Sequence, residues 1–389
     1  MPHPESARRF RQMYLGLRDA DIREEVRAFR LRFRSEAACY RFLFRMKWPS
    51  GFVCPQCGFR RAYTIRTRRW PLYECRFCRH QTTLYAGSVM ARTRVSPRQW
   101  LLAIWLVSRL PDGISAPRLK AQLGVTYKTA FSMLRKIRSI ITQADERRPL
   151  TDLVKVIGLR FTPRVELIDY TKPGPPVLVA ATFAKDATPV RVKMKAVDEG
   201  NLNFFSRYPS VIGAWAERHV DTGSGKLAVA RASDVRNMMP LPAWFRDACE
   251  RTYRVYCGVS RAFLHGYLDE HCFRLNGILT RRLTPRSREM KVRVWSAEEQ
   301  TSFVPFGRTA PVNTDLAECT GNDLSGGSAL QMYVPVNLLP EMYLSRTDVP
   351  EGLPPLEEEL ARWCMSMPAR QTRAFPIQVP VPPWLAQVS

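Results

Sequence analysis

The pattern of apolar and polar positions divides the chain into a helical first part and a strand-rich second part. Residues 96–108 (SPRQWLLAIWLVS) begin with a Ser-Pro pair and carry a broad apolar face, which predicts a core helix. Four β-branched runs separated by turn residues predict the strands of a sheet, at 153–161, 165–170, 176–184 and 189–197. The last two runs are joined across Lys185, Asp186 and Ala187, where we expect a hairpin.

Residues 113–141 (GISAPRLKAQLGVTYKTAFSMLRKIRSII) predict two helices joined by a tight turn. The first helix is expected over Ala116 to Leu123 and the second over Tyr127 to Ile140, with Gly124 as the left-handed turn residue. In a helix-turn-helix the second helix enters the DNA major groove by its first side chains. The residues expected to contact DNA here are Thr126, Tyr127, Lys128, Thr129, Arg135, Lys136 and Arg138.

Basic residues concentrate in the first part of the chain. Residues 1–150 hold 31 Lys or Arg against 10 Asp or Glu, a net charge of +21, whereas residues 151–389 hold 29 against 25, a net charge of +4. Because Arg outnumbers Lys in the basic part and guanidinium groups suit phosphate recognition, we expect a polyanionic partner, double-stranded DNA. A solvated basic surface without a partner is the alternative.

The chain has no run of 18 apolar residues, so the sequence predicts no membrane span. It opens with no charged-then-apolar leader, so we expect no export and a cytoplasmic protein associated with the nucleoid. In such a compartment the ten cysteines are expected to be reduced thiols or metal ligands rather than disulfides.

Four cysteines form two Cys-x-x-Cys pairs separated by 17 residues: Cys54, Cys57, Cys75 and Cys78. This spacing is typical of a structural zinc site, because each tight turn presents two thiolates and two such turns complete a tetrahedron. An iron–sulfur centre is the competing interpretation, and His80 could replace a cysteine, but neither is needed to explain the spacing. We therefore expect a structural Zn²⁺ in a domain too small to fold without it.

The segment between the two cysteine pairs predicts a ribbon. Its stretches RRAYTIRT and PLYEC are rich in Tyr, Ile and Thr and are expected to form short strands. Basic side chains would project from the long loop, where a DNA backbone could lie. These are Arg60, Arg61, Arg66, Arg68 and Arg69.

The composition changes near the C-terminus. Twelve of the 30 prolines lie after residue 300, which predicts irregular loops and a partly extended tail over a small core. Residues 354–367 (PPLEEELARWCMSM) predict a single helix with acidic residues in its first turn. An interaction tail and an eroded sequence are both open interpretations of this region.

Three stretches together resemble a known family, at residues 35–58 (SEAACYRFLFRMKWPSGFVCPQCG), 73–90 (YECRFCRHQTTLYAGSVM) and 96–138 (beginning SPRQWLLAIWLVS). The family is the bacterial insertion-sequence transposases that carry an N-terminal zinc ribbon, a helix-turn-helix and a DDE catalytic domain. A weaker similarity returns at residues 251–277. The resemblance implies a ribonuclease-H-like core in which three acidic or amide side chains hold two Mg²⁺ ions for DNA strand cleavage and transfer. It also implies a homo-oligomer, since two DNA ends must be brought together.

The catalytic positions depart from that family's pattern. Where the family places an Asp-Glu pair on the first strand, this chain has Val156, Ile157 and Gly158, none of which can bind a metal. The remaining candidates for catalytic acids are Asp234 in ARASDVRNM, Glu270 in YLDEH, and Asp169 or Glu166 in VELIDY. A structural role is the favoured interpretation of Glu270.

These expectations define a multidomain fold with a small β zinc ribbon, an α-helical helix-turn-helix and a truncated or degenerate α/β ribonuclease-H-like domain. The expected boundaries are 1–35 for a basic helical segment, 36–92 for the ribbon, 93–145 for the helix-turn-helix, 150–290 for the ribonuclease-H-like part and 291–389 for an irregular Pro-rich C-terminal region. Two functions stay open. One is a DNA-binding protein without an intact catalytic triad, and the other is an active Mg²⁺-dependent DDE transposase.

Overall fold

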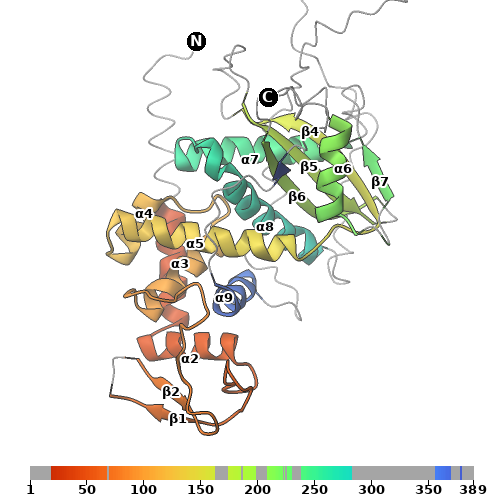
Figure 1. Cartoon of the computed structure of the whole chain (residues 1–389). Helices are drawn as coiled ribbons and strands as arrows, with labels where there is room; N and C mark the ends of the chain where they lie inside the picture. Colours follow the sequence, from red (N-terminus) through yellow and green to blue (C-terminus); the bar gives the residue numbers. More distant parts are fainter. Residues whose placement is uncertain are drawn as a thin grey trace, which may run out of the picture. The chain divides into compact units, whose positions relative to one another are not determined.

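The computed structural model describes residues 19–67, 70–162, 174–184, 187–198, 208–221, 223, 226–229, 238–282, 355–368 and 377–378 (Figure 1). The chain divides into two compact units, Met1–Arg281 with Glu351–Ser389, and Arg282–Pro350. All elements given below belong to the first unit, apart from the final residue of α8. The predicted strand at 165–170 lies outside the described residues.

A small antiparallel sheet forms the predicted ribbon. Its strands β1 (Ala62–Ile65), β2 (Leu72–Cys75) and β3 (Gln81–Thr83) pair in the order β1-β2-β3. Helix α2 (Glu36–Lys47) covers this sheet, and the ring of Phe44 lies 5.6 Å from that of Tyr73 between centroids. The Lys47 ammonium donates to the Leu84 carbonyl at 2.7 Å, which ties the end of α2 to the ribbon.

The helical part agrees closely with its sequence pattern. Residues 19–32 are helical, and α3 (Pro97–Arg109) starts with a capping box in which Ser96 and Gln99 bond to each other's backbone N–H. Helix α4 (Ala116–Leu123) has the predicted bounds. It ends at Gly124, which has a φ of 65°, a left-handed conformation that glycine adopts without strain. Helix α5 (Tyr127–Glu146) starts where predicted and continues past Ile140.

A mixed sheet follows the helices. The strands β4 (Leu153–Arg160), β5 (Pro176–Phe183), β6 (Pro189–Asp198), β7 (Lys226–Val229) and β8 (Ile377–Gln378) lie in the order β7-β4-β5-β6-β8. Strands β4, β5 and β6 are antiparallel neighbours, so the predicted β5–β6 hairpin is confirmed, while β7 runs parallel to β4. Helix α6 (Tyr208–His219) connects β6 to β7 in the chain and packs Trp215 against the β4 side chains Val154 and Val156.

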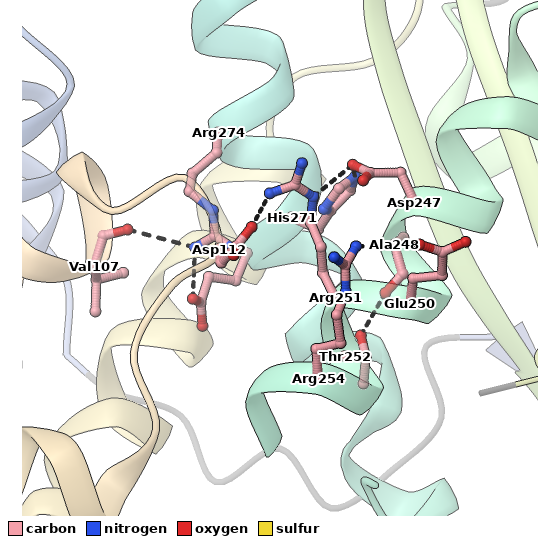
Figure 2. Close-up of polar contacts among 11 residues, drawn as sticks. Val107, Asp112, Asp247, Ala248, Glu250, Arg251, Thr252, Arg254, His271 and Arg274 are labelled. Carbon is pink, nitrogen blue, oxygen red and sulfur yellow. Dashed lines mark hydrogen bonds and ion pairs between the residues drawn. The ribbon is translucent and has the colours of Figure 1, made fainter. Parts of the chain in front are cut away.

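Helices α7 (Leu241–Tyr256) and α8 (Leu264–Arg282) are joined to the loop after α3 by charged side chains. Figure 2 shows Arg251 of α7 between Asp112 and Asp247, with its Nε donating to Asp247 at 2.6 Å. Arg274 of α8 donates to the Val107 carbonyl at 3.4 Å. These contacts fix the last turns of α3 and the loop after it against two helices that come more than 100 residues later.

Helix α9 (Leu356–Ser366) packs into the core of the N-terminal helices. It contacts α2, α3 and α5, and Leu360, Ala361 and Cys364 are 0% exposed (Figure 1, blue). The Val89 N–H donates to the Cys364 carbonyl at 3.0 Å. The predicted helix in residues 354–367 is confirmed, but sequence analysis did not predict that it completes a core formed by residues far upstream.

Buried charges join α5 to the sheet. Lys193 and Lys195 on β6 are both 0% exposed. The Lys195 ammonium lies 2.8 Å from Asp145 of α5 and 2.5 Å from Asp269 of α8, and Lys193 donates to the Asp145 carbonyl at 2.7 Å. Burial alone would lower the pKa of Lys195, but the two carboxylates outweigh burial and raise it. Burial lowers the pKa of Lys193 to about 8.

A second buried cluster joins α5 to α8 and to the end of α7. Glu270 of α8 is 1% exposed and accepts from Arg138 of α5 at 2.6 Å and from Arg274 at 2.6 Å. The hydroxyl of Tyr256 adds a third hydrogen bond at 3.2 Å. Burial alone would raise the pKa of Glu270, but the two guanidinium groups lower it, so the carboxylate stays ionised. The middle of α5 is therefore held by an ion pair inside the protein.

The first prediction concerns α9. Leu360→Ala is expected to lower the free energy of unfolding by about 2–5 kcal/mol, because it leaves a cavity among α2, α3 and α5. The matched control is Arg362→Ala on the exposed side of the same helix, with an expected change below about 0.5 kcal/mol. Urea unfolding followed by tryptophan fluorescence measures both, and equal effects of the two variants would show that α9 does not belong to this core.

The second prediction concerns the Glu270 cluster. Glu270→Ala is expected to cost about 3–5 kcal/mol of stability, because two buried guanidinium groups lose their counter-charge. Glu250→Ala is the control: its ion pair with Arg254 is partly exposed, and its loss is expected to cost less than about 1 kcal/mol. The same urea titration compares them, and a Glu270→Ala protein as stable as the control would contradict a structural role for this carboxylate.

Candidate metal centre and nucleic-acid interface

Two turns of matching geometry present the four cysteines. In the first turn the Cys54 N–H donates to the Phe59 carbonyl at 2.9 Å, and in the second the Cys75 N–H donates to the His80 carbonyl at 2.9 Å. Gly58 and Arg79 take left-handed conformations at equivalent places, with φ of 73° and 59°. The chain thus reverses twice in the same way, and each reversal turns two thiols inward.

The sulfur atoms of Cys54, Cys57, Cys75 and Cys78 lie within 4.8 Å of one another. The Cys54–Cys78 and Cys57–Cys75 sulfur pairs are both 3.6 Å apart. A tetrahedral Zn²⁺ with Zn–S bonds of about 2.3 Å requires sulfur separations of about 3.8 Å, so the site fits a single zinc ion. His80 is not part of this group, and the compact set of sulfurs leaves no room for a cluster of several irons.

The thiols also fit a cation electrostatically. Burial alone would raise the pKa of Cys54, but N–H groups of Cys57 and Gln56 and the neighbouring thiols lower it to about 7. The His80 N–H lowers the pKa of Cys78, but burial and the other three sulfurs raise it to about 12. Four thiolates so close together repel one another, and a divalent cation removes that repulsion. The ribbon therefore carries a structural Zn²⁺ site.

The predicted arginines of the ribbon divide into two groups. Arg60, Arg61 and Arg66 are exposed, whereas Arg68 and Arg69 lie outside the described residues. Sequence analysis missed two further exposed arginines, Arg76 and Arg79, on the second zinc turn. Their signal was the stretch CRFCR, in which arginine follows each zinc ligand.

The start of α5 presents most of its predicted side chains to solvent. Tyr127 is 52% exposed, and Thr126, Lys128 and Arg135 are exposed as well. Thr126 caps the helix by accepting from the Thr129 N–H at 3.2 Å, and the two hydroxyl oxygens lie 2.9 Å apart. Thr129 therefore takes part in the helix cap, and its side chain is half-buried.

Two further basic residues of α5 differ in their environment. Lys136 is half-buried, with its ammonium 5.9 Å from the ring centre of Trp100. Arg138 is 6% exposed and ion-paired with Glu270. The expectation that Arg138 contacts phosphate is wrong for this structure, because a buried and paired guanidinium offers no surface to DNA.

The predicted catalytic acids do not assemble a metal site among the residues that the structure describes. Asp169, Glu166 and Asp234 lie outside them, and β4 carries no Asp or Glu along its length. Glu270 is engaged by two arginines, so it has no free oxygen to offer to Mg²⁺. In the described part of the chain, the donors close enough to share an ion are the four cysteines.

The three histidines of the second part are structural. His219, His265 and His271 are all buried. Burial is the first cause that lowers the pKa of each, to about 3 for His219. They are therefore neutral near pH 7 and are not placed to bind a metal together.

A comparison with known protein families finds a match for the ribbon. Residues 34–81 match the profile of the transposase zinc-ribbon domain. These residues include α2, the four cysteines, the strands β1 and β2, and the first residue of β3.

A curated relative extends the similarity. The chain is 30% identical over 118 residues to an uncharacterised protein in the transposable element ISH50 of Halobacterium salinarum. The match covers 30% of this chain and 38% of the relative, so the chain spans well under half the length of that relative. No solved structure matches the chain. Among the helices that the structure describes, none has the length and apolar character required to cross a membrane. Residues 34–81 are thus similar to transposase zinc ribbons, and 118 residues of the chain are similar to a protein of a transposable element.

Proposed function

We propose that this chain is a transposase-type DNA-binding protein that binds double-stranded DNA through its zinc ribbon and the α4–α5 pair. The observation that carries the proposal is the zinc site within residues 34–81, which match the transposase zinc-ribbon domain and hold the four cysteines at metal-binding distances. In such a protein the ribbon would position the chain on DNA through phosphate contacts by Arg60, Arg61 and Arg66.

The α4–α5 pair supports the second DNA contact. The left-handed Gly124 between the two helices leaves the first turn of α5 exposed, with Tyr127 and Lys128 at its surface. A helix presented in this way can enter the major groove, where polar side chains read base edges. Arg135 lies further along the same exposed side and would reach the backbone. The net charge of +21 on residues 1–150 favours both contacts.

The second part of the chain is proposed to be a ribonuclease-H-like frame without catalytic acids. Its sheet of three antiparallel strands, followed by α6 and the parallel strand β7, is compatible with that α/β class. The strand that would carry the first acidic pair is β4, which has Val156, Ile157 and Gly158 instead. A homo-oligomer that joins two DNA sites remains part of the proposal.

An active DDE transposase is the second candidate. It is favoured by one observation, the parallel pairing of β7 with β4, because Asp234 follows β7 closely in the chain. Chemistry of this kind requires carboxylates that hold two Mg²⁺ ions, one beside the attacking oxygen and one beside the leaving oxygen. Glu270 does not fit as one of these ligands because of its two arginine partners.

The third prediction links zinc to DNA binding. Cys75→Ala is expected to lose the zinc and to unfold the ribbon, because the metal replaces the core that this small domain lacks. Loss of three arginine contacts is expected to make the slope of log K against log salt shallower by about 2–3, at about 0.9 for each phosphate contact. Cys257→Ser, at an exposed cysteine remote in sequence from the ribbon, is the control.

Fluorescence anisotropy on a duplex taken from the flanks of the protein's own gene, at several salt concentrations, measures the slope. Zinc content is measured on the same samples. A Cys75→Ala protein with unchanged affinity and slope would remove the ribbon from the DNA interface.

The fourth prediction separates the two candidate functions. Footprinting on the same DNA with EDTA or with Mn²⁺ is expected to show protection without strand breaks, because β4 offers no metal ligand. Asp234→Asn is expected to leave the footprint unchanged. Breaks that require Mn²⁺ and disappear in Asp234→Asn would instead establish the active transposase.

A further inference from the structure

The zinc ribbon exposes an unusual number of aromatic side chains. Among the residues that the structure describes, four aromatic side chains are strongly exposed, and three of them belong to the ribbon: Phe59 at 39%, Tyr63 at 47% and Phe77 at 75%. The fourth is Tyr127 at the start of α5. A side chain such as Phe77 costs free energy when it faces water, so three of them on one small domain indicate a binding surface.

Two of the three rings lie at the zinc turns, and the third lies on β1 beside the arginines of the second turn. Phe59 follows the first cysteine pair and Phe77 lies inside the second, and their ring centroids are 5.8 Å apart. Tyr63 is on β1, with the guanidinium carbons of Arg76 and Arg79 at 4.6 and 5.8 Å from its ring centre. The zinc site therefore holds apolar rings and cationic groups next to each other on a rigid support.

The ribbon is also hollowed, on the side of the small sheet where Ala62 and Thr64 of β1 lie. A hollow of about 470 Å³ is lined by three arginines, Arg60, Arg61 and Arg76, together with the aromatic side chains Phe44, Phe52 and Tyr73. Phe52 and Tyr73 lie with ring centroids 5.7 Å apart at an angle of 29°. The hollow thus places three arginines beside buried aromatic side chains, and one of these arginines, Arg76, also lies over the ring of Tyr63.

We propose that the zinc ribbon binds single-stranded DNA, with unpaired bases stacking on Phe59, Tyr63 and Phe77 and with phosphates held by Arg60, Arg61 and Arg76. Every base has an apolar face, and arginines beside aromatic rings are the combination that holds unpaired strands. In duplex DNA those base faces are covered by neighbouring bases, so exposed rings on the ribbon would find no partner there. The rings would then bind the unpaired strand, the ribbon arginines would contact phosphates of paired or unpaired DNA, and α5 would read the duplex.

This inference rests on the proposed DNA-binding function and divides it between two surfaces. The positive charge of the ribbon argues against an apolar protein surface as the partner, because each of the three rings lies within a few residues of exposed arginines in the sequence. An unpaired strand satisfies both the rings and the charges.

The test uses the full chain with zinc and two fluorescent probes, a mixed-sequence single strand and a duplex of the same length. The triple variant Phe59→Ala, Tyr63→Ala, Phe77→Ala is compared with Tyr127→Ala, an exposed aromatic on α5, and with Leu31→Ala, an exposed apolar residue outside both surfaces. Zinc content and circular dichroism confirm that each variant is folded.

The triple variant is expected to lose at least about fivefold in affinity for the single strand per base that it no longer stacks, and less than about twofold for the duplex. Tyr127→Ala is expected to weaken the duplex only, and Leu31→Ala neither. Equal losses on both probes, or unchanged single-strand affinity in the triple variant, would overturn the inference. So would self-association that the triple variant alone abolishes while single-strand binding persists, because the rings would then form a protein interface.

Different results would refute the proposed DNA-binding function and the inference about single-stranded DNA. A wild-type chain that binds neither probe refutes the proposed function itself. A wild-type chain that binds the duplex but not the single strand refutes only the assignment of the ribbon to unpaired DNA.

Discussion

The buried charges along α5 are the interaction on which the described structure depends. The start of this helix is exposed beside Gly124, its middle is paired through Arg138 with Glu270, and its end is paired through Asp145 with Lys195. Such pairs contribute little net stability when complete, because desolvation offsets the Coulomb attraction. They are very costly when broken, since a lone buried charge has no water to replace its partner. The buried ion pairs therefore act mainly to fix the position of α5, because they form in only one packing arrangement of α5 against α8 and β6.

The same constraint explains why the C-terminal helix α9 belongs to the N-terminal core. Its acidic first turn faces one basic residue of the helix at 19–32 and one just after α5: Glu358 lies 2.7 Å from Arg32, and Glu359 lies 2.8 Å from Arg148. Its apolar side fills the space among α2, α3 and α5. The partly exposed pairs add little energy, so the apolar side stabilises the helix while the charges select its orientation.

Sequence reasoning succeeded where one short segment decides the structure. Three features depend only on residues close together in the sequence, so the sequence alone was enough to predict them. They are the Cys-x-x-Cys turns, the Ser96 cap and the left-handed Gly124. Sequence reasoning failed where the partner is remote. Arg138 looked like one more surface cation because nothing near it in the sequence reveals Glu270, which lies 132 residues later. The place of α9 was hidden for the same reason, since amphipathic character predicts a helix but not the surface that covers it.

The sheet has a structural role whether or not it ever cuts DNA. The sheet contacts α5 through Lys193 and Lys195 of β6. Without these two lysines, the carboxylates of Asp145 and Asp269 would lose their counter-charges. The absence of acidic residues from β4 does not affect this arrangement, because β4 is a different strand from β6, which carries the two lysines. Loss of the sheet itself would release the end of α5 and, with it, the fixed presentation of Tyr127 and Lys128. For the proposed DNA-binding function, the sheet would therefore be needed to hold α5 in place, whatever its own chemistry.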